Sequence, residues 1–515
     1  NYSTITSNII DVLTSGSGGL GAIHLKSPSY NNTVAGNIIN ITSGVGAVGI
    51  IVRVGSHNNT IIGNNVNNSG NGNQGIRVFS GTLHTNITSN TFQMNGTDSK
   101  GIWIQTGSNY TSVTGNRIIM TGNGSYGIYL DGGMNRSFIG NNINMTGNMS
   151  YGLFVQNNSN MSFRENVIET IGPNGYSVYI EEDSDYNLFK DNNITRSLSD
   201  AFRFNVTGGA YPENNNLTNN ILTNIAGYDI NFEAASINGT ILQDQIIANY
   251  SFAGVGGKLK VINTSFGEIN FLREINGSGL NFSNVIIIRN NSAFSNDTVG
   301  AFGLNKTANI TLYGLKQNLI NPRIIRDGAT CTQAMGCYNF TALTAGTVSF
   351  NVSGFSNYSI SETPAISFSN PTFANNTKIL PTGGAQVNIS INSTGLTEFT
   401  WNWNGTNYTM YNDSLVLMMN FENLSDLGEN QTFVRDNSIY GNNASTVINA
   451  TLISGGGKYG NAFYFNRSLL SDGVYINPIG VYRLENTSLT TWIKRDSIGH
   501  WTSIFGRCST DWYFG

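Results

Sequence analysis

Charged side chains are scarce in this sequence. Only 11% of its 515 residues are Asp, Glu, Lys or Arg, and 26 basic against 30 acidic residues leave a formal net charge of −4. A chain with no basic excess lacks the electrostatic footprint of a nucleic-acid or anionic-membrane binder. No run of about 18 apolar residues occurs either, so no segment of this sequence is expected to span a bilayer.

Proline, cysteine and histidine are also rare, with 8, 3 and 4 residues. So little proline fits poorly with collagen, and three cysteines are too few for a disulfide-dense scaffold. Cys331 and Cys337 are close enough to close a small loop in an oxidising compartment, which leaves Cys508 unpaired. The histidines are His24, His57, His84 and His500. They form no ligand cluster in the sequence, and we expect no metal site.

Glycine and asparagine are abundant instead, with 60 and 78 residues. About forty of the asparagines precede Ser or Thr by two positions, where random placement would give about 15. An AT-rich genome would explain the asparagine but not this pairing. We therefore expect an extracellular or cell-surface glycoprotein. The glycosylation candidates outside the repeats described below are Asn296, Asn309, Asn351, Asn388, Asn423 and Asn486. No signal peptide is recognisable and the first residue already lies inside a repeat, so we expect a fragment cut at both ends.

An internal repeat runs through the first half of the chain. A Gly-Ile-x-Val-like tetrapeptide recurs every 25 or 26 residues, at 49–52, 75–78, 101–104, 127–130 and 152–155. A column of asparagines keeps nearly the same step, 25 to 27 residues: Asn37, Asn64, Asn90, Asn116, Asn141, Asn166 and Asn192. Apolar residues stand two positions after and three positions before each of them. Every repeat thus carries at least three short strands.

This pattern predicts a parallel β-helix, in which each rung stacks on the next at about 4.8 Å. A leucine-rich repeat would need a Leu-x-x-Leu-x-Leu frame, whereas these repeats have β-branched residues with Asn and Gly at the corners. Stacked Ile, Val and Phe are expected to form inner ladders. The Asn column is expected to hydrogen-bond along the stack and so satisfy polar groups that the coil takes out of water.

The N-x-I and G-I-x-V pattern over residues 1–275 resembles the right-handed parallel β-helix repeat family, the pectate-lyase-like and NosD-like surface proteins. The resemblance implies the fold and says little about activity, because such families include polysaccharide lyases and hydrolases, phage tailspikes and non-enzymatic adhesins. NosD-like proteins are linked with copper-site assembly, which we do not expect here because the histidines do not cluster.

The outward face of the G-I-x-V strands is the candidate functional surface. Since Ile and Val point inward, the alternating residues point to solvent. The expected carbohydrate-binding residues are Arg77, Trp103, Gln105, Tyr129, Asp131, Phe154, Gln156, Tyr179 and Glu181. Stacked aromatic rings offer a platform for the apolar faces of sugars, and the flanking polar groups suit sugar hydroxyls. Alternatively, the aromatic ladder only stabilises the sheet or is covered by another part of the protein.

Catalysis is the less favoured expectation. Asp131 and Glu181 lie two rungs apart, roughly 9.6 Å by rung spacing, at the far edge of the range for an inverting glycosidase. They are weak catalytic candidates. A lyase would need a base beside a calcium ion held by several acids, and no Asp cluster lies near Arg53 or Arg77. The acidic run at 181–185 is more simply a solvated turn.

The rest of the chain reads as further β modules. Residues 276–362 alternate like the strands of a small β-sandwich, and the stretch 350–358 resembles the end of a module that follows β-helix repeats in archaeal surface proteins. Residues 363–412 are expected to form a linker and a short Ig-like spacer.

Residues 413–515 resemble half of a laminin-G or concanavalin-A-like jelly roll. The matching stretches are 415–421, 436–443, 457–465 and 489–494. Half of such a sandwich does not place its sugar or calcium site, and calcium is the one cofactor that the resemblance suggests.

Together these observations predict an all-β chain: a right-handed parallel β-helix followed by β-sandwich modules and an incomplete jelly roll. The expected function is adhesin-like binding of a polysaccharide or surface glycan at the cell surface. A secreted polysaccharide lyase or glycoside hydrolase is one alternative. A purely architectural spacer of the cell envelope is another.

Overall fold

The computed structural model describes residues 2–17, 21–26, 28–295 and 303–362, and then shorter stretches: 365–370, 372–374, 377–378, 387–393, 396, 398–403, 405–412, 414–458, 460–465, 473–476, 488–495, 505–506 and 513–514. The chain forms two compact units, Asn1–Asn392 and Ser393–Gly515. Strands dominate both units, and the α-helix found in the described residues is the single turn α1 (Phe282–Val285). The predicted all-β class is confirmed.

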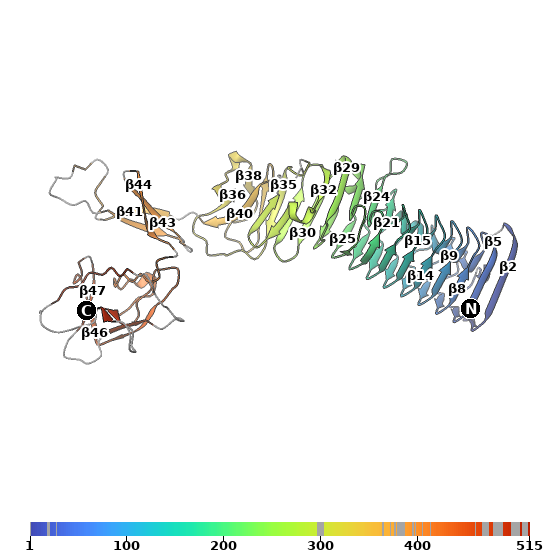
Figure 1. Ribbon diagram of the computed structural model, residues 1–515, viewed down its shortest axis with the longest axis horizontal. Helices are drawn as coiled ribbons and strands as arrows, with labels where there is room; N and C mark the ends of the chain where they lie inside the picture. The colour runs from blue at the N-terminus through green and yellow to red at the C-terminus, as the bar shows by residue number, and fades with distance from the viewer. Residues whose placement is uncertain are drawn as a thin grey trace. The chain divides into compact units, whose positions relative to one another are not determined.

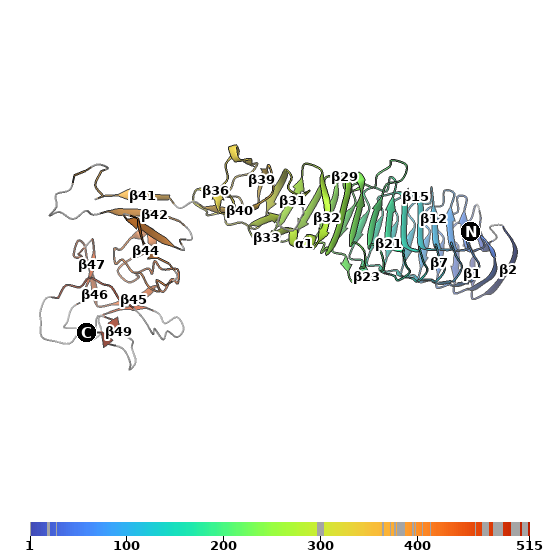
Figure 2. The same ribbon diagram turned by 45° about the horizontal axis from the view of Figure 1, so that its top comes forward.

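The first unit begins with a parallel β-helix, in which successive rungs add strands to three long sheets (Figures 1 and 2). The parallel strands of sheet A are β1 (Thr4–Thr6), β4 (Thr33–Ala35), β7 (Thr60–Ile62), β10 (Asn86–Thr88), β13 (Ser112–Thr114), β16 (Ser137–Ile139), β19 (Ser162–Arg164), β22 (Leu188–Lys190), β25 (Asn216–Thr218), β28 (Thr240–Gln243) and β30 (Leu259–Asn263).

The other two sheets follow the same order along the coil. Sheet B contains β2 (Ile9–Ser17), β5 (Ile38–Val45), β8 (Asn65–Asn68), β11 (Thr91–Met94), β14 (Arg117–Met120), β17 (Asn142–Met145), β20 (Val167–Thr170), β23 (Asn193–Ser197) and β26 (Ile221–Leu222). Sheet C contains β3 (Gly21–Leu25), β6 (Val48–Arg53), β9 (Gln74–Phe79), β12 (Lys100–Gln105), β15 (Tyr126–Met134), β18 (Tyr151–Ser159), β21 (Tyr176–Glu181), β24 (Phe202–Asn205), β27 (Ile230–Glu233), β29 (Asn249–Gly257) and β32 (Ile275–Leu280).

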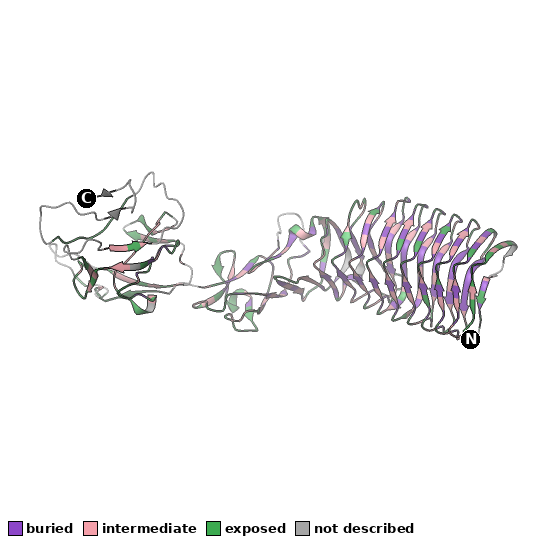
Figure 3. Cartoon of the chain, turned by 90° about the horizontal axis from the view of Figure 1, so that it is seen from below, coloured by how far each residue is buried: buried purple, intermediate pink, exposed green. Residues whose placement is uncertain are grey.

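Residues one repeat apart lie directly over one another. In sheet C, Ile102 pairs with Ile76 on one side and Ile128 on the other. The inward apolar residues are almost fully buried, and Figure 3 shows buried positions alternating with more exposed ones along the strands. Phe163 of sheet A stacks between Phe138 and Phe189, with ring centroids 4.7 Å apart on both sides. The predicted inner ladders are confirmed.

The predicted Asn column is also confirmed. It lies at the corner between sheets A and B and continues to Asn220. Each side-chain amide donates to the amide oxygen of the next rung at 2.9 to 3.0 Å, as from Asn90 to Asn116 and from Asn116 to Asn141. The same oxygens accept the backbone N–H of the preceding asparagine. Buried polar groups are thereby satisfied without water.

The coil's sheets continue into the following residues. Beyond β30, sheet A gains the antiparallel strands β31 (Gly267–Phe271), β35 (Ala308–Leu312), β39 (Val348–Val352) and β38 (Cys337–Asn339). A second antiparallel sheet contains β33 (Ile286–Arg289), β34 (Ser292–Ser295), β40 (Asn357–Glu362), β36 (Pro322–Arg326) and β37 (Ala329–Thr330). Buried residues such as Ile310, Phe350 and Ile360 extend the core of the coil.

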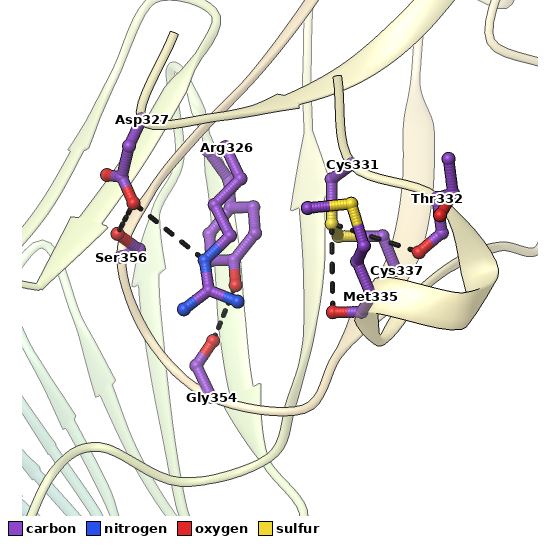
Figure 4. The surroundings of a disulfide bond; sticks show 9 residues. Arg326, Asp327, Cys331, Thr332, Met335, Cys337, Gly354 and Ser356 are labelled. Carbon is purple, nitrogen blue, oxygen red and sulfur yellow. Dashed lines mark hydrogen bonds and ion pairs between the residues drawn. A yellow bond between two sulfur atoms is a disulfide. The ribbon is translucent and has the colours of Figure 1, made fainter. Parts of the chain in front are cut away.

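A disulfide joins Cys331 to Cys337, with an S–S distance of 2.01 Å (Figure 4). The preceding hairpin connects β36 to β37 through Asp327 and Gly328, both with positive φ, as a tight two-residue turn requires. The Asp327 carboxylate accepts hydrogen bonds from the Ser356 hydroxyl and from the backbone N–H of Asn357. These contacts fix the hairpin against β40. Cys508 lies outside the described residues.

The last strands described are short antiparallel pairs. In the first unit β41 (Ala365–Ser369) pairs with β42 (Asn388–Asn392). In the second unit the pairs are β43 (Phe399–Trp403) with β44 (Thr406–Tyr411), β45 (Ala444–Ile448) with β48 (Gly473–Ile476), β46 (Ala450–Ile453) with β47 (Ala462–Phe465), and β49 (Phe505–Gly506) with β50 (Tyr513–Phe514). The division at 275, 362 and 412 and the jelly-roll resemblance stay predictions.

Candidate functional site

Stacking places all the predicted carbohydrate-binding residues on one face of sheet C. Trp103 pairs with Arg77 and Tyr129, and Phe154 pairs with Tyr129 and Tyr179. Beside this column runs a polar one in which Gln105, Asp131, Gln156 and Glu181 pair in sequence. Both columns belong to β9, β12, β15, β18 and β21.

The central rings contact one another directly. Tyr129 and Phe154 stack with centroids 4.9 Å apart, and Phe154 and Tyr179 stack at 5.3 Å. Trp103 meets Tyr129 edge to face at 5.8 Å. Trp103, Tyr129 and Tyr179 are half-buried. Phe154 is only 7% exposed, so the expectation of an exposed ring at this rung is wrong.

A second aromatic column, which the sequence reasoning missed, covers Phe154. It consists of Tyr126, Tyr151 and Tyr176, whose neighbouring rings stack at 5.1 and 5.8 Å. Tyr126 and Tyr151 both meet Phe154 edge to face. We call both columns together with the neighbouring lysine the aromatic strip. It consists of Arg77, Trp103, Tyr129, Phe154 and Tyr179, of Tyr126, Tyr151 and Tyr176, and of Lys100.

The outward position of this second column has a structural cause. Strict alternation from the inward residue Ile128 would point Tyr126 inward as well. The backbone instead buries Gly127 and Ile128 in succession, and Tyr126 returns to the outer face. A Cβ on Gly127 would lie 2.6 Å from the carbonyl oxygen of Gly152, so only glycine fits. The signal in the sequence was the tyrosine that recurs every 25 residues, two positions before the inward residues Ile128, Leu153 and Val178.

Two cations lie among the rings at the end of the strip nearer the N-terminus. The Lys100 ammonium is 5.0 to 5.2 Å from the ring centroids of Trp103, Tyr126 and Tyr129. The Arg77 guanidinium lies 4.3 Å from the Trp103 ring and donates to the Gln105 side chain at 2.9 Å. Burial lowers the pKa of Lys100, and repulsion from the Arg77 charge lowers it further. Attraction to Asp98 opposes this shift without cancelling it. None of the ion pairs found in the described residues involves either cation.

Acidic side chains lie toward the end of the aromatic strip that is nearer the C-terminus. Gln156 separates Asp131 from Glu181 in the polar column, and its amide donates to Glu182 at 2.7 Å. Burial raises the pKa of Glu181, and the nearby Glu182 charge adds to this, while a hydrogen bond from Thr207 opposes it. The Tyr129 hydroxyl donates to Gln156 at 3.1 Å, which ties the polar column to the rings.

The predicted glycosylation candidates lie in different surroundings. Asn309 and Asn351 pair across β35 and β39, and the amide of Asn351 donates to Asn309 at 3.2 Å. Asn388 donates to the backbone of Asn370 at 3.0 Å, and Asn423 is exposed in a loop. Asn296 and Asn486 lie outside the described residues.

The residues that the structure describes contain no group of three His, Cys, Asp or Glu side chains able to hold a metal ion. His24 lies on sheet C, His57 and His84 lie before sheet A strands, and His500 is not among the described residues. None of the helices in the described parts of the chain is long and apolar enough to cross a membrane.

A family match supports the coil. Residues 100–266 match the family described as right handed beta helix region, which includes the aromatic strip from β12 onward. A solved structure of a mutant tailspike protein from E. coli bacteriophage HK620 aligns at 9% identity with a TM-score of 0.28, covering 67% of this chain and 74% of that one. No significant match was found among curated protein sequences. The coil of the first unit is a right-handed β-helix.

Proposed function

We propose that this protein is an extracellular, glycosylated surface protein that binds a glycan through the aromatic strip. The observation that carries the proposal is the double column of rings edged by a continuous polar column on one face of the coil. Sugar rings present apolar C–H faces to aromatic side chains and hydroxyls to planar amides and carboxylates. Because the same arrangement repeats over several rungs, it suits a chain of sugars.

The charges of the strip favour an acidic glycan. Lys100 and Arg77 are partly buried, and both lie over aromatic rings. A carboxylate or sulfate on a sugar would neutralise them and relieve the repulsion between Arg53, Arg77 and Lys100. Binding through these cations is expected to weaken as salt increases.

The remaining parts of the chain support a surface role. The excess of N-x-S/T contexts favours secretion, and the resemblance of residues 413–515 to laminin-G-like modules favours a second, lectin-like part. The resemblance of residues 276–362 to modules of archaeal surface proteins points in the same direction. The proposal includes a calcium ion bound by the C-terminal module, residues 413–515.

The test is binding of the full chain to an array of acidic and neutral glycans. Replacing Trp103 and Tyr129 together by alanine is expected to weaken binding more than ten-fold, because each ring contributes about 1 kcal/mol beyond its burial. Tyr338→Ala is the matched control, since this tyrosine is 50% exposed on β38. Unchanged binding by a folded double variant would refute the role of the strip and favour an architectural spacer.

A polysaccharide lyase or glycoside hydrolase is the second candidate. It is favoured by Glu181, whose raised pKa suits a proton donor, and by Asp131, which lies two rungs away on the same column. Acidic polysaccharides incubated with the protein would then release reducing ends or unsaturated products. Loss of this release in Asp131→Asn would establish the enzyme, and no release from the wild type would exclude it for the substrates tried.

A further inference from the structure

From β4 to β25, the corner between sheets C and A contains one left-handed residue two positions before each sheet A strand. With φ between 55° and 59°, these residues are Asn31, Asn58, His84, Tyr110, Asn135, Asn160, Tyr186 and Asn214. Apart from Tyr110, the backbone N–H of each of these residues donates to a carbonyl of the next rung, as His84 does to Asn109 and Asn135 does to Ser159. The column is therefore a regular feature of the coil.

Asparagine is the favourable residue for this conformation, because its short polar side chain tolerates the left-handed region. Tyrosine does so at a cost in free energy, whereas histidine is itself enriched there. His84 and Tyr110 occupy it in two consecutive rungs. The coil imposes this conformation on Tyr186 as well, so the conformation alone assigns no role, and His84 and Tyr110 are distinguished by lying on adjacent rungs.

The two rings form one wall of a hollow. His84 and Tyr110 stack with centroids 5.0 Å apart and an interplanar angle of 11°. A shallow, open hollow of about 330 Å³ is lined by Asn58, His84, Asn86 and Tyr110. All four side chains are exposed, and Tyr110 keeps 50% of its surface accessible. No Asp, Glu, Lys or Arg is among the lining residues.

We propose that this hollow binds one uncharged sugar ring. The stacked rings offer a small apolar surface for part of a sugar ring, and the amides of Asn58 and Asn86 can donate to and accept from its hydroxyls. The hollow differs from the aromatic strip in its residues and in its lack of formal charge. The proposal is therefore independent of glycan binding by the strip.

Such a sugar has two sources. Asn58-Asn59-Thr60 and Asn86-Ile87-Thr88 are both N-glycosylation contexts, so the ring can belong to a glycan attached at the hollow itself. It can also belong to a separate glycan. The experiment has one arm for each source.

The first arm uses the full chain made in a host without N-glycosylation. Saturation-transfer NMR is recorded with the methyl glycosides of glucose, galactose, mannose and N-acetylglucosamine. Transfer to at least one glycoside is expected, with at least a five-fold loss in Tyr110→Asn. Tyr186→Asn is the matched control, because it makes the same replacement in the same column at a 60% exposed tyrosine away from the hollow. It is expected to keep the transfer.

The second arm uses the chain secreted from a glycosylating host, with occupancy of Asn58 and Asn86 measured by glycopeptide mass spectrometry. Serine replaces tyrosine in this arm, because asparagine at position 110 would create an Asn-Thr-Ser glycosylation context. If the sugar is attached, enzymatic deglycosylation lowers the unfolding midpoint of the wild type and of Tyr186→Ser by at least 2 °C and leaves that of Tyr110→Ser unchanged. Saturation transfer in the first arm without a midpoint shift in the second identifies a separate glycan. A midpoint shift in the second arm without saturation transfer in the first identifies an attached glycan. Absence of both, or equal effects of the two variants, overturns the proposal.

Discussion

At the scale of single residues, the Asn column shows how the coil closes a corner without water. Asn116 is 1% exposed and uses its whole amide. Its Nδ2 donates to Asn141 and to the carbonyl of Ile87, while its Oδ1 accepts from the backbone and the side chain of Asn90. Removing the Asn116 amide therefore takes the acceptor away from the buried backbone N–H and side-chain amide of Asn90, while the Asn141 oxygen keeps the backbone N–H of residue 116.

Asn116→Ala is accordingly expected to destabilise the first unit by about 3 kcal/mol or more, since each unpaired buried polar group costs about 1 to 3 kcal/mol. The urea midpoint of the far-UV circular dichroism transition measures the effect. The control is Asn142→Ala at the exposed first position of β17, which should change stability by less than about 0.5 kcal/mol. Equal midpoints for the two variants would contradict a stabilising role of the ladder.

At the scale of elements, the sequence period predicted the features that recur on every rung. It did not predict which way a side chain points where the backbone departs from strict inward and outward alternation. The inner ladders and the Asn column follow from a step of 25 or 26 residues. The Tyr126 column did not follow, because two consecutive residues turn inward at Gly127. The burial of Phe154 depends on Tyr126 and Tyr151 beside it, so the sequence reasoning that omitted these tyrosines also assigned Phe154 the wrong exposure.

The inward turn at Gly127 gives a second prediction. Gly127→Ala would place a Cβ 2.6 Å from the Gly152 oxygen and 2.6 Å from Ile143, so the strand must shift, at a cost of about 1 to 3 kcal/mol. The shift would also move Tyr126 out of the strip and weaken glycan binding. Thermal unfolding and the glycan array measure these two effects.

Gly140→Ala is the control for this substitution. Gly140 has φ of 62°, and a Cβ added there would meet no atom within 4 Å, so only the backbone preference opposes alanine, by about 1 kcal/mol. Glycan binding by the control should be unchanged. If Gly127→Ala keeps full binding and loses no more stability than Gly140→Ala, close approach of the strands does not shape the strip.

At the scale of the whole molecule, the parts differ in how they are joined. The β-helix and residues up to 362 share sheet A and one hydrophobic core, whereas Ser393–Gly515 forms a compact unit of its own. The repeat pattern gives way to alternating strand-like runs near residue 276 and so predicted a boundary there. The sequence did not show the pairing of β31 with β35 and of β35 with β39, because antiparallel partners far apart in the chain leave no periodic trace.

Two truncated chains test this difference between the shared core up to residue 362 and the separate unit Ser393–Gly515. A chain ending at residue 275 would lose β35 and β39 and expose the core side of Ile269 and Phe271, which are buried in the full chain. An open apolar sheet edge promotes aggregation, so this chain is expected to unfold at a lower temperature and to elute as oligomers in size-exclusion chromatography. A chain ending at residue 392 keeps the shared core and is expected to show the same main unfolding transition as the full protein. A stable monomer from the shorter chain would show that the coil needs no cap from residues 276–362.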